Sequence, residues 1–210
     1  MLLSDIEIAE RCNASLDPLV MPQLITLTPL ISPFSLSQVR TDENNKKIVS
    51  YGLSSYGYDV RLADDFKVFR TQTEDGYGLL QVPIDPLRAN ERDYIVTRAR
   101  KDGTIIIPAG GFLLGRTVEY FNVPRDILVM CLGKSTLARL GIQVIVTPLE
   151  PEWSGELVLE IYNCSPRPVK LYVGHGIAQL VFSRGGPIKT SYADRAGKYQ
   201  GQIGVVTAKV

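Results

Sequence analysis

Residues 157–162, LVLEIY, are the stretch that decides the fold. Successive side chains of a β-strand point to opposite faces, so positions 157, 159 and 161 share one apolar face, and Val158, Glu160 and Tyr162 share the other. This pattern predicts a strand packed on a core. The face that carries Glu160 is either partly buried or simply solvated. Burial would raise the pKa of the carboxyl group toward neutrality, where it could accept and return a proton, and a nearby arginine would lower it again.

Other parts of the chain repeat the dimensions of this strand. Short, mostly apolar runs are separated by Gly, Pro, Asn or Asp, which is typical of a β-sandwich or barrel. These runs are Thr104 to Ile107, Phe112 to Leu114, Ile127 to Leu132, Gln143 to Val146, Val169 to Tyr172 and Ile177 to Phe182. Phe66 and Val68 alternate in the same way. Between Gly133 and Gly141, residues 134–140 predict a short helix or a helical turn between strands.

The amino-terminal region predicts a helix and an arm. Ser4 and Glu7 match a capping box, which indicates a short helix. Prolines disfavour a long helix between Leu16 and Phe34, so an extended arm or loop is expected there. These are Pro18, Pro22, Pro29 and Pro33. Without an internal repeat or a low-complexity linker, the sequence predicts one mainly-β domain over 1–210, with the helix and arm in 1–50 and a tail in 190–210.

Composition excludes several classes of protein. The chain has 210 residues, of which 45% are hydrophobic and 21% charged, as in ordinary globular proteins. Lys and Arg number 23 against 22 Asp and Glu, so no large positive charge is available for nucleic acid or an anionic membrane. The apolar runs are far shorter than the roughly 20 residues that span a bilayer. Residues 1–10 lack the basic region of a secretory signal, so we expect a cytoplasmic protein.

Histidine and cysteine are too sparse for several kinds of chemistry. The chain has one histidine, His175, and three widely spaced cysteines, Cys12, Cys131 and Cys164, which disfavour a disulfide framework. It has no CxxC, HxE or HExxH pattern, and no pair of histidines for a zinc site. Catalysis would then depend on carboxylates, hydroxyls, Lys, Arg or the backbone.

The turn after Gly133 carries groups that can bind an anion. The sequence GKST at 133–136 is not a nucleotide-binding P-loop, because that motif needs a glycine where this chain has Leu128. A lysine, two hydroxyl groups and then Arg139 nevertheless lie close together beside glycines. A capped surface helix without a ligand explains the same residues equally well.

The tail between Ser191 and Gln202 mixes aromatic, basic and amide side chains. Such a segment could fold over a charged ligand, with Lys198 on phosphate and Tyr192 stacking or hydrogen-bonding. Most polar tails, however, simply fray.

Several motifs, in this order, resemble the zinc-independent dCTP deaminase family of the trimeric dUTPase-like superfamily. They are SSYGYDVRL at 54–62, GKSTLARLG at 133–141, EPEWSG at 150–155, Leu159-Glu160 and GKYQGQ at 197–202. The resemblance covers most of the chain. It implies a dUTPase-like distorted β-barrel subunit with few short helices, in a homotrimer with active sites at the subunit interfaces. The implied reaction converts dCTP to dUTP and ammonia and supplies dUTP for thymidylate synthesis.

The resemblance also implies residue roles. Glu160 matches the catalytic glutamate, which would take a proton from the water attacking C4 and pass it toward N3 and the departing amine. Ser135 and Arg139 match residues that position this water and polarise the site. The nucleotide-binding residues implied are Lys134, Ser135 and Thr136 at the triphosphate, Thr147 and Pro148 at the base edge, Gln179 on the phosphate side, and Tyr192, Lys198 and Gln202 in the closing tail.

Magnesium and no zinc follow from the same resemblance. Mg²⁺ bridges triphosphate oxygens and keeps several waters, so no carboxylate cage need appear in the sequence. Feedback-regulated relatives make dTTP a candidate inhibitor.

The loop before Glu160 departs from the family pattern. It is shorter than in some members, and Pro148 and Glu150 stand where a small residue and an aspartate are common. In bifunctional deaminase-dUTPases an aspartate in this loop helps to activate water for attack on phosphate, so Glu150 favours an enzyme that releases dUTP. A dUTPase, a bifunctional enzyme releasing dUMP and pyrophosphate, and a silent nucleotide sensor remain alternatives. The sensor would not need Glu160.

Overall fold

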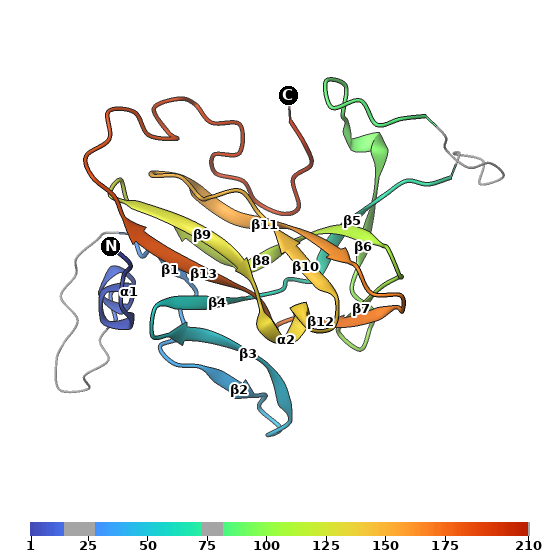
Figure 1. Ribbon diagram of the computed structural model, residues 1–210, viewed down its shortest axis with the longest axis horizontal. Coiled ribbons are helices and arrows are strands. Elements are labelled where there is room, and N and C mark those ends of the chain that lie inside the picture. Colours follow the sequence, from blue (N-terminus) through green and yellow to red (C-terminus); the bar gives the residue numbers. More distant parts are fainter. Residues whose placement is uncertain (15–27, 73–81, 210) are drawn as a thin grey trace.

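The described structure, a computed structural model, consists mainly of β-strands (Figure 1). It describes residues 1–14, 28–72 and 82–209. The elements are α1 (Asp5–Arg11), β1 (Ile31–Ser32), β2 (Val39–Thr41), β3 (Lys47–Ser54), β4 (Gly57–Arg61), β5 (Asp65–Phe69), the 3-10 helix η1 (Glu91–Asp93), β6 (Tyr94–Arg98), β7 (Thr104–Ile107), β8 (Phe112–Asn122), β9 (Ile127–Gly133), α2 (Ser135–Ala138), β10 (Ile142–Ile145), β11 (Ser154–Asn163), β12 (Val169–Tyr172) and β13 (Gly176–Arg184). The prediction of a mainly-β chain with few short helices is confirmed.

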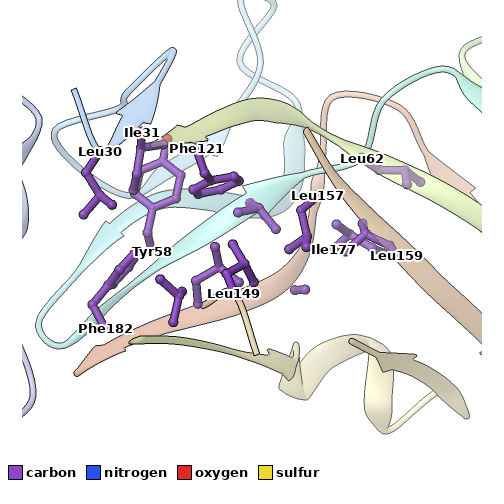
Figure 2. Packing of buried hydrophobic residues seen from close by; sticks show 14 of the residues in the cluster. Leu30, Ile31, Tyr58, Leu62, Phe121, Leu149, Leu157, Leu159, Ile177 and Phe182 are labelled. Carbon is purple, nitrogen blue, oxygen red and sulfur yellow. The ribbon is translucent and has the colours of Figure 1, made fainter. Parts of the chain in front are cut away.

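Two larger sheets enclose the core. One has the order β10-β11-β8-β5-β6 with β1 added on β8, and the other has the order β2-β3-β4-β13-β9. Strands β12 and β7 form a separate ribbon. Tyr58 of β4, Phe121 of β8 and Phe182 of β13 are fully buried and join both sheets in one apolar cluster (Figure 2). Burial of such large side chains is the main favourable contribution to folding.

Strand β11 follows the alternation that the sequence predicts. Leu157, Leu159 and Ile161 are buried in the main core, whereas Glu160 is half-buried on the opposite face. The register of β11 on β8 shifts between Glu156 and Val158, which marks a β-bulge. The strand therefore presents Glu160 to a different environment from that of its apolar face.

Local sequence signals account for both helices. The capping box at α1 is present, because the Ser4 side chain accepts from the Glu7 backbone N–H and the Glu7 carboxylate accepts from the Ser4 backbone N–H. Within 134–140, only a single turn forms, α2. Of the predicted arm, residues 15–27 with Pro18 and Pro22 lie outside the described residues, and β1 pairs with β8. Among the described residues, no helix reaches the length and apolarity that crossing a membrane requires.

Candidate active site

A cavity of about 710 Å³ lies beside Glu160. Strands β8 and β11 provide one wall through Leu114, Val158 and Glu160. The loop 146–150 provides a second wall, and tail residues between Tyr192 and 208 line the remaining side. The volume is in the range of small-molecule sites, which are usually apolar clefts with a few polar groups.

Glu160 is a half-buried acidic group in this cavity, and its pKa is shifted by its apolar surroundings. Its cross-strand partners are Leu114 on β8 and Ile145 on β10, both aliphatic. Its Oε2 atom is buried and has no hydrogen-bond partner among the described residues. Burial raises the pKa of the Glu160 carboxyl to about 7. The partly buried alternative is therefore correct, and the group can take up and release a proton near neutral pH.

The loop that contains Thr147 and Pro148 is fixed by backbone pairing. Leu149 is buried and exchanges two hydrogen bonds with Val129 of β9, at 2.9 and 3.0 Å. This pairing brings Thr147 and Pro148 to the cavity. The Glu150 carboxylate, which also lines the cavity, forms an ion pair with Arg195 of the tail. Glu150, which is longer than the aspartate common at this position in the family, thus contacts the tail.

The tail is packed against the domain and does not fray. The Trp153 indole donates to the Tyr199 carbonyl at 3.0 Å, and the Tyr199 backbone N–H donates to the Tyr192 hydroxyl at 3.0 Å. Gln202 pairs with Gly155 in a parallel bridge. In Figure 1 the red carboxyl-terminal chain accordingly loops back over the sheet toward β11. Tyr192 and Gln202 both line the cavity, as does Tyr199.

The side chains expected to bind phosphate lie elsewhere in the chain. Lys134 Nζ forms an ion pair of 2.6 Å with Asp59, and both side chains are almost buried. Ser135, Thr136 and Arg139 are exposed on or beside α2, and the Arg139 guanidinium donates to the Ser135 carbonyl at 3.1 Å. None of these residues lines the Glu160 cavity.

Two other expected residues also lie outside this cavity. Gln179 donates to Ser54 Oγ at 3.3 Å, and Lys198 Nζ donates to the Lys209 carbonyl at 3.2 Å. The described part of the chain thus brings together Glu160, the loop expected at the base edge and part of the tail, but not the groups expected at the phosphates.

Sequence reasoning missed the apolar wall of the cavity. The Phe69 ring stacks on those of Tyr94 and Phe112, with ring centroids 4.8 and 5.4 Å apart, and all three line the cavity. Their alternation along strands is the signal for ordinary core residues, so nothing in the sequence separates them from the core. Tyr199 lies inside the GKYQGQ motif, and its position there was the signal that could have found it.

The described residues contain no group of three or more His, Cys, Asp or Glu side chains that could hold a metal ion. Cys12, Cys131 and Cys164 are free. Burial raises the pKa of the Cys12 and Cys131 thiols to about 12, with the negative charge of Glu160 as a second cause at Cys131. Both thiols therefore stay protonated near neutral pH, which makes them poor nucleophiles and metal ligands.

Comparison with known proteins shows the family to which this chain belongs. Residues 35–185 match a family described as dCTP deaminase-like. The dCTP deaminases of Alcanivorax borkumensis and Paraburkholderia xenovorans are each 50% identical to this chain over 177 residues, 84% of this chain and 88% of theirs. A solved deoxycytidine triphosphate deaminase of Agrobacterium tumefaciens has a TM-score of 0.47 and 23% identity, covering 63% of this chain and 39% of that one. This chain belongs to the dCTP deaminase family of enzymes.

Proposed function

We propose that this protein hydrolyses dCTP to dUTP and ammonia in the cytoplasm and so supplies dUTP for thymidylate synthesis. The observation that carries the proposal is the buried Oε2 of Glu160, which lies beside a cavity of about 710 Å³ and has no hydrogen-bond partner in the part of the chain that the structure describes. A carboxyl group with a pKa of about 7 populates both protonation states at neutral pH. Membership of the dCTP deaminase family supports the choice of substrate.

Glu160 would move both protons of the attacking water. As a carboxylate it removes one proton while the water oxygen bonds to C4, and this proton passes to N3. From the resulting C4 hydroxyl it transfers the second proton to the amino group. The C4–N bond then breaks, ammonia leaves, and the hydroxyl oxygen becomes the C4 carbonyl of uracil. The carboxylate is regenerated, so one residue can serve as base and acid in turn.

The triphosphate would enter as its Mg²⁺ complex, since that ion belongs to the substrate and keeps several of its waters. Lys134, Ser135, Thr136 and Arg139 supply the positive charge and hydroxyl groups that suit such a ligand. Gln179 and Lys198 complete the set on the phosphate side. The ligand site would also admit dTTP, a competing pyrimidine triphosphate, as an inhibitor.

A homotrimer with interfacial sites explains why one subunit separates the two halves of the site. Ser135 and Arg139 would polarise the site and position the water from a neighbouring subunit. Large apolar side chains lie exposed on the strands around the cavity: Met130 and Leu132 on β9, Ile145 on β10 and Tyr162 on β11. Exposed apolar groups gathered on neighbouring strands are typical of interaction surfaces.

Product analysis tests the proposal against the bifunctional alternative. The ion pair of Glu150 with Arg195 favours the monofunctional enzyme, because it occupies the carboxylate that would activate water for attack on phosphate. EDTA-treated protein would be incubated with dCTP and excess Mg²⁺, and nucleotides, ammonia and pyrophosphate measured. We expect dUTP and ammonia without pyrophosphate. dUMP with pyrophosphate would support the bifunctional enzyme, and saturable binding without turnover would support a nucleotide sensor.

A further inference from the structure

The end of the tail is held by two carboxylates outside the expected site, Glu156 and Glu91. We propose that these two are positioning residues that keep residues 202–208 closed over the Glu160 cavity. Their effect on dCTP turnover rests on the proposed function. Their effect on tail closure does not, because it follows from contacts within the chain.

Glu156 contacts the tail through its backbone and its side chain. Its backbone N–H donates to the Gln202 carbonyl, and its own carbonyl accepts from the Gln202 side chain, both at 2.9 Å. Its Oε2 accepts from the Gly204 backbone N–H at 2.6 Å. Hydrogen bonds to an ionised acceptor are about twice as strong as those between neutral groups. Glu156 thereby fixes the tail to β11, the strand that carries Glu160.

The other oxygen of Glu156 is held from the sheet. Arg116 Nη1 lies 3.1 Å from Oε1, and Arg116 Nε forms an ion pair of 2.7 Å with Asp65. The side chains of all three residues are less than one-fifth exposed, at 17 to 19%. Low exposure reduces screening by solvent, so this chain of charges can orient the Glu156 carboxylate toward Gly204.

Glu91 of η1 makes the second attachment. The Thr207 hydroxyl donates to Glu91 Oε1 at 2.6 Å, and Lys67 Nζ pairs with the other oxygen at 2.6 Å. Thr207 is buried, with 5% of its surface exposed. The attachment fixes the far end of the tail to the β5–β6 region.

Between the two attachments, the tail contacts the neighbours of Glu160. Val205 is buried against Leu114 and Val158, which lie beside Glu160 on β8 and β11. The next three residues line the cavity. Opening the tail would therefore admit water to the cavity and remove nucleotide contacts such as Gln202. The apparent affinity for nucleotide equals the affinity of the closed form multiplied by the fraction of molecules in which the tail is closed.

The test compares Glu156→Ala with Asp126→Ala in the full chain. Asp126 makes an ion pair of 2.7 Å with Arg11 but does not line the cavity, so it is a matched control. Hydrogen exchange of peptides from the last ten residues measures closure, and KM and kcat for dCTP measure its consequence. We expect faster exchange and a KM about ten-fold higher in Glu156→Ala, with kcat changed less than about two-fold because saturating nucleotide closes the tail.

Two milder variants keep the test valid if Glu156→Ala unfolds. Glu156→Gln retains an acceptor for Gly204 and should lie between wild type and Ala. Thr207→Val keeps the side-chain shape and removes the hydroxyl donor to Glu91, and it should also speed exchange and raise KM. Unchanged exchange in all three variants would overturn the proposal, as would an equal effect of Asp126→Ala. If the variants exchange faster than wild type but wild type itself never turns over dCTP, the result would contradict the proposed function alone.

Discussion

Leu114 of β8 stands directly across from Glu160 of β11 in the register of the two strands. Directly opposite residues of an antiparallel pair lie on the same face with Cβ atoms about 5 Å apart. An aliphatic side chain at this distance withholds water from the carboxylate and offers it no hydrogen bond, so it adds to the burial that raises the pKa of Glu160. The same alternation that builds the sheet therefore also sets the proton affinity of the candidate catalytic group.

Replacing the carboxyl group should stabilise the protein at alkaline pH. The pKa of Glu160 is raised from 4.5 to about 7 in the folded state, so the folded protein binds more protons than the unfolded chain between these values. Stability then falls as pH rises through this window. As the pH rises from 4.5 to 7, the free energy of unfolding of Glu160→Gln should increase relative to that of wild type by up to about 3 kcal/mol, at 1.36 kcal/mol per pKa unit. Urea unfolding of both proteins at several pH values measures this difference, and a constant difference across the window would contradict it.

The pH dependence of the reaction should report the same group. Because the carboxylate is the form that accepts the proton of water, kcat/KM should rise with pH and level off above about 7. Leu114→Asn places a polar group of similar size opposite Glu160, so kcat/KM of this variant should begin to rise at a lower pH. Ile95→Asn, at an exposed position of β6, should leave the pH profile of kcat/KM unchanged. Identical profiles for the two variants would argue against Leu114 as the cause.

Mixed assemblies should reveal the interfacial site. Arg139 does not line the cavity that contains Glu160, so we expect it to act on a neighbouring subunit. Arg139→Ala and Glu160→Gln should each be inactive alone. After unfolding, mixing in equal amounts and refolding, about a quarter of the sites would join an intact Glu160 to an intact Arg139, if subunits assemble at random in a ring. Activity that does not recover on mixing would place both residues in one subunit.

The close approach of Gly197 to Tyr192 should control nucleotide affinity. A Cβ atom at Gly197 would lie 2.1 Å from the Tyr192 ring, so Gly197→Ala must displace this part of the tail. Gly186→Ala is the matched control, because a Cβ there meets no atom within 4 Å. In the Glu160→Gln background, calorimetry should give a Kd for Mg²⁺–dCTP at least about ten-fold higher for Gly197→Ala. Equal Kd values for the two alanine variants would show that Tyr192 does not need its present position.

Sequence patterns were most informative where one strand face is buried. The alternation at 157–162 predicts β11 and the two faces of the strand, and Ser4 with Glu7 predicts the start of α1. Strand β6 and the β2–β3 hairpin were not predicted, because most of their residues are half-buried or exposed and they lack a clear apolar face. Sheet pairing decides those segments, and local sequence does not encode it.

The candidate site was predictable only in part. The expected site residues Glu160, Tyr192 and Gln202 do meet at one cavity. The ion pair of Lys134 with Asp59 and the Glu156–Gly204 contact join segments 75 and 48 residues apart, and no local pattern specifies such partners. The register of β11 on β8 also shifts at Glu156, the residue that contacts the tail, and hydrophobic alternation does not reveal such a shift.

The main inference is that Glu160 removes a proton from the water that attacks C4 of the pyrimidine. Its most direct test is turnover of dCTP with Mg²⁺ in oxygen-18 water, followed by mass spectrometry of the products of wild type and Glu160→Gln. We predict one heavy oxygen in the uracil base of dUTP from wild type, and labelling by Glu160→Gln that is slower by at least about a hundred-fold, from the usual contribution of a general base. Heavy oxygen found in phosphate, or full labelling of the base by Glu160→Gln, would contradict the claim.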